Sequence, residues 1–180
     1  MTDQLIFNFP SKKIYLKDDF YVSKSNEQAY DLIKSWPKWV KRIVNIFGPR
    51  GSGKTHISSF LKNKTTFLKV DSNKLNEKIF TKFKTKEALI LENVSEKISE
   101  NIFFSLWNEA LHDNKYFLIT SVKPINQYNF KLLDLKSRLN TCLSVGIKLP
   151  NDDLIRVIIA KNFSDKQIKV EKKYFLKFFR

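Results

Sequence analysis

Residues 48–55 have the sequence Gly-Pro-Arg-Gly-Ser-Gly-Lys-Thr, and this stretch decides the fold. It fits the pattern G-x-x-x-x-G-K-[ST], in which glycines let backbone N–H groups turn inward around a phosphate. Lys54 is expected to reach the terminal phosphates of ADP or ATP, and the Thr55 hydroxyl is expected to hold Mg²⁺. The apolar run 43–47 leads into the loop, and helical spacing resumes at Lys54. A chance glycine-rich turn would lack this strand–loop–helix context, so we interpret the stretch as a phosphate-binding loop (P-loop). Its predicted nucleotide-binding residues are Gly48, Pro49, Arg50, Gly51, Ser52, Gly53, Lys54 and Thr55.

Short apolar runs alternate with amphipathic stretches on both sides of the P-loop. Strands are expected at 43–47, 65–70, 88–91, 116–120 and 142–149. Helices are expected within 25–39 and at 54–62, 75–83, 98–112, 132–139, 151–163 and 171–180. This alternation predicts an α/β fold with a parallel sheet that is covered by helices on both faces.

The composition points to one cytoplasmic domain. A chain of 180 residues with a single cysteine, Cys142, has room for one core and cannot form an internal disulfide. The N-terminus lacks the basic start and apolar stretch of a secretory signal, and no apolar run approaches membrane-spanning length. The net charge of +15 permits non-specific contact with DNA. Because the lysines are spread along the chain, a solvated lysine coat is the commoner explanation of this charge.

A P-loop ATPase needs a carboxylate at the end of a neighbouring strand to organise the metal. Glu92 follows the run 88–91 and is the expected Mg²⁺ ligand together with Thr55. Asn93 occupies the position of the usual catalytic acid, and an amide cannot accept a proton as a general base. Asp71 also ends a strand, but that strand is expected at the outside of the sheet. We therefore expect nucleotide binding, with weak or no ATP hydrolysis by this chain alone.

Other polar and aromatic residues have simpler explanations when each is taken alone. Arg138 near a helix end is more often a cap or surface ion pair than a catalytic arginine. His56 and His112 lack metal-ligand spacing and are interpreted as structural. The aromatics Phe103, Phe104 and Trp107 lie at helical spacing and are expected in the core.

The order of these motifs resembles the DnaA/Hda branch of the AAA+ ATPases, and is most similar to Hda-like replication regulators of alphaproteobacterial type. The resemblance rests on residues 19–29 (Asp-Phe-Tyr-Val-Ser-Lys-Ser-Asn-Glu-Gln-Ala), 36–39 (Trp-Pro-Lys-Trp), 51–56, 118–121 (Leu-Ile-Thr-Ser) and 133–139 (Leu-Asp-Leu-Lys-Ser-Arg-Leu). It implies an AAA+ core at 17–149 and the start of an incomplete helical lid at 150–180. It further implies that Phe20, Val22, Asn26 and His56 lie with the nucleotide, the first three against its base.

The resemblance also implies partners. Residues 1–16 form an N-terminal arm in which Gln4, Leu5, Phe7 and Phe9 resemble a peptide that binds the DNA polymerase sliding clamp. Arg138 corresponds to an arginine finger that would enter the nucleotide site of a DnaA-type initiator and promote hydrolysis of its ATP at the replisome. Self-association into a homo-oligomer is compatible with such a finger.

The sequence departs from the family pattern in three places. Glu92 replaces the more usual aspartate, Val122 stands where a polar sensor residue is usual, and the chain ends at Arg180 before the sensor-2 arginine of the lid. Two other functions therefore stay open. One is an autonomous AAA+ ATPase such as a helicase loader, and the other is a DnaA-type ATPase fragment that contacts DNA.

Overall fold

The computed structural model describes residues 20–63, 65–165, 167 and 168. The N-terminal arm with the expected clamp peptide 4–9, and the helix expected at 171–180, lie outside these residues. None of the described helices is long and apolar enough to cross a membrane.

The centre of the molecule is a five-stranded sheet in which every strand pairing is parallel. Its strands are β1 (Ile43–Phe47), β2 (Phe67–Asp71), β3 (Ala88–Val94), β4 (Tyr116–Ser121) and β5 (Leu143–Gly146). The order is β2-β3-β4-β1-β5, so the strand that enters the P-loop is flanked on both sides. The predicted parallel α/β sheet is confirmed, and the expectation that the strand before Asp71 lies at the edge is confirmed as well. The last strand is shorter than the predicted range 142–149.

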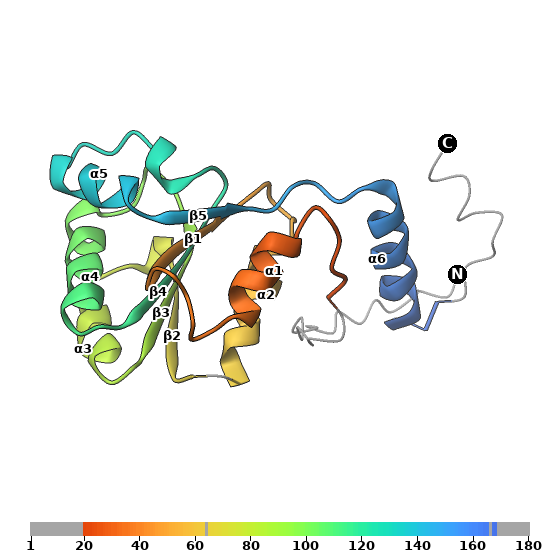
Figure 1. Ribbon diagram of the computed structural model, residues 1–180, viewed down its shortest axis with the longest axis horizontal. Helices are drawn as coiled ribbons and strands as arrows, with labels where there is room; N and C mark the ends of the chain where they lie inside the picture. The colour runs from red at the N-terminus through yellow and green to blue at the C-terminus, as the bar shows by residue number, and fades with distance from the viewer. Residues whose placement is uncertain (1–19, 64, 166, 169–180) are drawn as a thin grey trace, which may run out of the picture.

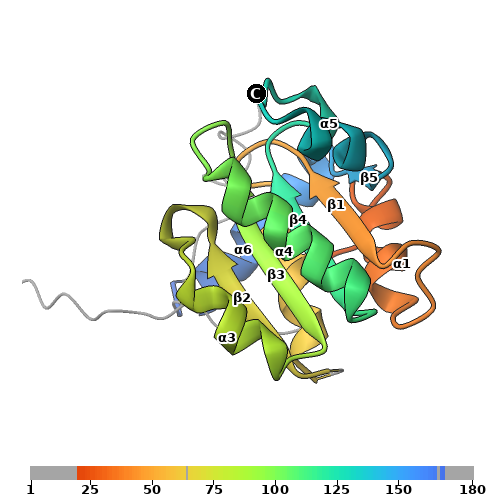
Figure 2. The ribbon, with the colours of Figure 1, turned by 90° about the vertical axis from the view of Figure 1, so that its left-hand side faces the viewer.

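Helices cover both faces of the sheet, as Figure 1 shows. One face carries α3 (Lys78–Lys84), α4 (Glu100–His112) and α5 (Leu133–Asn140), and the other carries α1 (Glu27–Lys34) and α2 (Lys54–Ser59). Strand β3 alternates between these layers: Leu89 and Leu91 belong to the core on the α4 side, and Ile90 belongs to the core on the α2 side. Figure 2 shows α4 crossing directly over the sheet.

Aromatic side chains fill the core on the α4 face. Phe103, Trp107, Phe117 and Phe130 are at most 2% exposed and meet mainly edge to face. Full burial of each such side chain stabilises the fold by about 1.5–3 kcal/mol. Phe103 and Trp107 therefore have the predicted core role, whereas Phe104 is only half-buried at the edge of this cluster.

Local hydrogen bonds explain where the third helix departs from its predicted start. Residues 72–74 form a 3₁₀ turn (η3) because the Asp71 carboxylate accepts the Asn73 N–H at 3.0 Å. Asn76 Oδ1 then accepts the Lys78 N–H at 3.1 Å, so the α-helix begins at Lys78 rather than at residue 75. Two further 3₁₀ turns are η2 (Phe60–Asn63) and η4 (Ile125–Gln127).

Helix α6 (Asp152–Asp165) lies beyond α1 and α2 as viewed from the sheet (Figures 1 and 2). Asn151 Oδ1 accepts the Leu154 N–H at 3.1 Å, and Asp152 and Asp153 occupy the first turn. Side-chain capping and negative charge both favour a helix start at this point, as the sequence predicts. The segment between β5 and α6 carries this helix to the P-loop side of the molecule.

Candidate functional site: a P-loop pocket

The P-loop has a backbone that requires glycine at specific positions. Gly51 and Gly53 have φ values of 80° and 92°, in the left-handed region that side chains disfavour. Gly53 is the N-cap of α2, so the loop turns directly into the helix N-terminus. A Cβ on Gly48 would lie 2.4 Å from the Ile147 carbonyl oxygen, which leaves no space for a side chain. The loop therefore has the conformational features of a phosphate-binding turn at a positive helix end.

The Lys54 side chain hydrogen-bonds to the backbone of its own loop. Its Nζ donates to the carbonyl oxygens of Gly48 at 2.8 Å and Pro49 at 2.7 Å, and the residue is 8% exposed. Burial lowers the pKa of Lys54 below its ordinary value because the charged form loses solvation. An anionic phosphate would restore a charge partner to this ammonium group. The Ser52 hydroxyl is buried in the same loop without a hydrogen-bond partner among the described residues. A bound phosphate could accept a hydrogen bond from it.

A pocket of about 1190 Å³ opens in front of the P-loop. Residues 50–56 form its floor, Phe20 and Asn26 lie at one wall, and α6 contributes Leu154 and Ile158 at the other. The structure therefore brings together the predicted residues Arg50, Gly51, Ser52, Gly53, Lys54, Thr55, His56, Phe20 and Asn26. Of the remaining predicted residues, Gly48 and Pro49 accept from Lys54 within the loop, and Val22 is exposed outside the pocket lining.

Aromatic contacts and a tight turn fix the wall nearest to α1. The Phe20 ring lies edge-on to His56 with centroids 5.2 Å apart and stacks with Tyr30 at 6.0 Å. Asn26 is 5% exposed, and its amide donates to the Tyr21 carbonyl at 2.9 Å while its Oδ1 accepts the Ser23 N–H at 2.8 Å. This wall combines packed aromatic rings with a hydrogen-bonded turn, and an aromatic surface suits a flat base.

Glu92 lies at the end of β3, beside the first turns of α2. It is 7% exposed, and its Oε1 accepts from the Ser58 hydroxyl at 3.2 Å. The same Oε1 lies 3.0 Å from Nζ of Lys69 on β2. The Ser58 hydroxyl also contacts the Thr55 carbonyl at 3.0 Å, so the predicted metal ligands Thr55 and Glu92 are linked through one turn of α2.

Asn93 lines the pocket from the neighbouring position. It adopts φ 59°, where β3 has a register irregularity against β4, and left-handed backbone is better tolerated by Asn than by most residues. Its Nδ2 lies 2.6 Å from Oδ2 of Asp71, and its N–H donates to the Thr120 hydroxyl at 3.1 Å. No group of three or more His, Cys, Asp or Glu side chains with metal-binding geometry occurs among the described residues.

The end of β4 adds apolar rather than polar character to the pocket. Val122 is 52% exposed and lines the pocket, and its N–H donates to the Tyr128 hydroxyl at 3.2 Å. Ser121, the preceding residue, is fully buried and donates to the Lys123 carbonyl. Val122 therefore presents no hydrogen-bonding side chain where a sensor residue would contact a phosphate.

Arg138 lies away from this pocket. It occupies the last turn of α5, is exposed, and is not one of the residues that line the P-loop pocket. An arginine in this place cannot serve the nucleotide site of its own chain without a large rearrangement, but it is accessible to another molecule.

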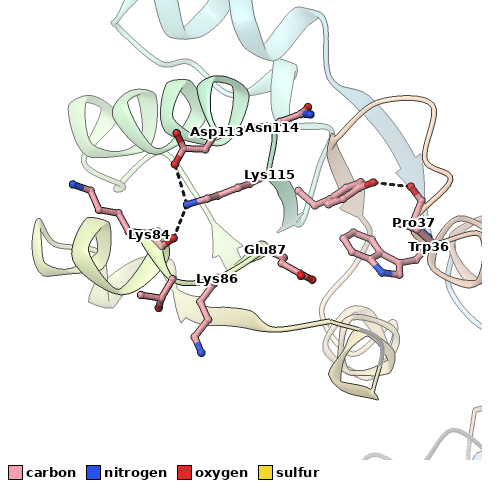
Figure 3. A pocket seen from close by; sticks show the side chains of 10 residues that line it. Trp36, Pro37, Lys84, Lys86, Glu87, Asp113, Asn114 and Lys115 are labelled. Atoms are coloured by element: carbon pink, nitrogen blue, oxygen red, sulfur yellow. Dashed lines mark hydrogen bonds and ion pairs between the residues drawn. The ribbon is translucent and has the colours of Figure 1, made fainter.

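A second hollow, of about 800 Å³, lies at the amino-terminal ends of β3 and β4, opposite the strand ends that face the P-loop (Figure 3). Lys115 is held there by Asp113 at 3.0 Å and by the Lys84 carbonyl at 3.1 Å. Trp36 packs on Tyr116, whose hydroxyl donates to the Pro37 carbonyl at 2.8 Å. These lining residues thus satisfy one another, in contrast to the Ser52 hydroxyl of the P-loop, which is without a partner in the described part of the chain.

The strand order, the two helical layers and the P-loop define the fold as that of an AAA+ P-loop NTPase domain. In sequence, the chain is 30% identical over 188 residues to the chromosomal replication initiator protein DnaA of Borreliella afzelii (strain PKo), with 89% of this chain and 39% of that protein covered. The chain thus spans about two fifths of the DnaA protein that it matches. No protein-family model matches the sequence.

Solved structures show the same fold. The replication initiator DnaA bound to AMPPCP and single-stranded DNA has a TM-score of 0.71 and 19% identity, with 89% of this chain and 58% of that chain covered. Domain III of DnaA from Thermotoga maritima has a TM-score of 0.68 and 18% identity, with 93% and 80% covered. The chain is therefore homologous to DnaA in sequence and similar to its domain III in fold.

Sequence reasoning did not find Lys148, which lines the pocket, or Lys69 and Ser58, which contact Glu92 outside the pocket lining. Lys148 and the α6 residues line the pocket through the path of the chain after β5, which no local pattern predicts. Lys69 could have been found from the period-2 alternation of β2, but only once β2 and β3 are known to be neighbours.

Proposed function

We propose that this chain is a nucleotide-binding, DnaA-related regulator of replication initiation that acts on a DnaA-type initiator. The proposal rests on a P-loop pocket that is lined by residues 50–56 and holds Asn93 at the position of the usual catalytic acid. Such a pocket can retain a nucleotide without turning it over efficiently. Homology to DnaA over 89% of the chain supports a role in replication initiation.

The nucleotide is ADP or ATP, with its phosphates on the P-loop and the N-terminus of α2. Backbone N–H groups of the loop and the Lys54 ammonium bind the phosphates, while Phe20 and the apolar side chains of α6 enclose the base. Of the two expected Mg²⁺ ligands, Thr55 lines the pocket, whereas Glu92 lies outside the lining and is paired with Lys69. DnaA has been solved with the ATP analogue AMPPCP, which supports this choice of ligand.

Arg138 acts in trans. Because it is exposed on α5, outside its own nucleotide pocket, it is available to a neighbouring molecule. A guanidinium placed against the ATP of the initiator would stabilise the negative charge that develops during hydrolysis and leave the initiator in its ADP form. The reacting nucleotide then belongs to the partner, and contact through α5 also allows homo-oligomers.

Tethering to the sliding clamp is the second part of the proposal. Gln4, Leu5, Phe7 and Phe9 would fill an apolar groove of the clamp as an extended peptide. The test compares clamp binding of the full chain with that of a chain lacking residues 4–9. We expect binding to disappear with the hexapeptide; equal binding by both chains would reject the tether.

The arginine finger is tested by the ATPase rate of the cognate initiator. Arg138→Ala should abolish stimulation while nucleotide binding by this chain is unchanged, and Lys136→Ala on the same helix is the matched control. Stimulation that survives Arg138→Ala would reject the finger.

A DnaA-type ATPase fragment that contacts DNA is the alternative function. The net charge of +15 favours contact with polyanions, and a DnaA structure contains single-stranded DNA. Affinity for single-stranded DNA that falls steeply with salt, together with Lys54-dependent ATP turnover in the absence of initiator, would favour this function over the regulator. Turnover alone would favour an autonomous ATPase such as a helicase loader.

A further inference from the structure

The pairing of β2 with β3 places three charged side chains on one face of the sheet. Lys69 is in register with Ile90, and Asp71 is in register with Glu92. Because side chains alternate along a strand, Lys69, Asp71 and Glu92 all face the α2 layer. Glu92 thus has a carboxylate directly across from it and a lysine on the diagonal, within reach of a long side chain.

Lys69 and Glu92 form a close ion pair. Lys69 Nζ lies 3.0 Å from Glu92 Oε1, and the Ser58 hydroxyl donates to the same oxygen at 3.2 Å. The side chain of Glu92 is 10% exposed and that of Lys69 is 32% exposed. Water and salt screen such a partly buried pair much less than one at the surface. The Lys69 ammonium therefore holds the acid that a P-loop site would use for its metal, while the single proton of the Ser58 hydroxyl is shared between Glu92 and the Thr55 carbonyl.

We propose that Lys69 is a built-in counter-ion of Glu92, so that this site binds ADP or ATP with little dependence on Mg²⁺. The inference rests on the proposed nucleotide site. A divalent cation that approached Glu92 would have to displace the Lys69 ammonium or share the carboxylate with it. Either event cancels most of the favourable free energy of binding the cation to that carboxylate. Lys54 and the loop N–H groups supply the charge that holds the phosphates. Lys69 acts through Glu92 and is a positioning residue rather than a nucleotide contact.

The test measures ADP affinity by calorimetry in excess Mg²⁺ and again in excess EDTA. For the natural chain we expect the two dissociation constants to agree within about threefold, and for Lys69→Gln we expect Mg²⁺ to tighten binding by about tenfold or more, which corresponds to about 1.4 kcal/mol. Lys69→Arg keeps the charge and should behave like the natural chain. Adding Glu92→Gln to Lys69→Gln should remove the gained dependence, because the metal then lacks its carboxylate.

The outcomes separate this inference from the proposed site. Binding that is tightened more than about tenfold by Mg²⁺ in the natural chain, or that has equal Mg²⁺ dependence with and without Lys69→Gln, would overturn the counter-ion role while the nucleotide site stands. No ADP binding under either condition, with the chain folded by circular dichroism, would overturn the nucleotide site and the inference with it.

Discussion

The Asn93 side-chain amide donates to the Asp71 carboxylate across the ends of β3 and β2, with Nδ2 2.6 Å from Oδ2. A carboxylate at position 93 would face Asp71 with like charge, whereas the amide supplies the donor that Asp71 needs. The amide at the position of the usual catalytic acid is therefore part of a local charge arrangement in which Asp71 is paired with Asn93 and Glu92 is paired with Lys69.

Restoring an acid at position 93 should require a second change. Asn93→Asp alone should lower the free energy of unfolding by about 1 kcal/mol, because a hydrogen bond is lost and two carboxylates meet. Asn93→Asp combined with Asp71→Asn reverses the pair and should restore that stability. A correctly placed base contributes about 100-fold or more to a hydrolysis rate, so only the double variant should show clear ATP turnover. Phosphate release and urea unfolding measure the two effects. Equal turnover by the single and double variants would show that Asp71 does not control this position.

Nucleotide binding should depend on Lys54. Lys54→Ala removes the only lysine ammonium that hydrogen-bonds within the P-loop of the described structure, so ADP affinity should fall by about 100-fold, or about 2.7 kcal/mol. Lys148→Ala, which changes a lysine that lines the pocket but lies outside the P-loop, is the control and should weaken binding far less. Fluorescence titration with labelled ADP checks both. Unchanged affinity for Lys54→Ala would reject the P-loop assignment.

The fold could be predicted from local patterns, but the details of the site could not. The 48–55 motif, the apolar run 43–47 and the strand–helix alternation suffice for a parallel α/β sheet, because each depends on residues close in sequence. The Lys69–Glu92 pair joins residues 23 positions apart and exists only because β2 is the neighbour of β3. The α6 wall of the pocket depends on the path of the chain after β5.

Glu96 should stabilise the fold in a pH-dependent way, with its contribution lost at low pH. The Asn129 N–H and the Lys123 ammonium both lie 3.2 Å from Glu96 Oε1, and together they hold the pKa of Glu96 below its ordinary value. A lowered folded pKa means that the contribution is complete above the unfolded value of about 4.3 and is lost as pH falls through the lower folded pKa. Glu96→Gln should therefore flatten the fall of the urea midpoint below about pH 4.3. Parallel curves for the natural chain and the variant would show that this contact does not stabilise the folded state.

Glu100 fixes the start of the helix that carries Arg138. Its carboxylate accepts the Lys131 N–H at 2.8 and 2.9 Å and the Leu132 N–H at 2.7 Å, and Leu132 is the N-cap of α5. A side chain of α4 thus satisfies backbone donors at the entrance to α5, where negative charge also favours the helix dipole. Glu100 therefore couples α4, which follows the strand of Glu92, to the helix of the proposed finger.

Glu100→Gln should weaken this coupling, because a neutral amide offers one acceptor oxygen in place of a charged pair. Hydrogen bonds to charged groups contribute about 1.5–3 kcal/mol, and we expect a loss of that size in the free energy of unfolding. Asn101→Ala, at an exposed position in the same turn, should change it by no more than about 0.5 kcal/mol. Amide hydrogen exchange should quicken in residues 133–140 of the Gln variant and stay unchanged in the control. Equal exchange in both variants would mean that α5 holds its position without the Glu100 carboxylate.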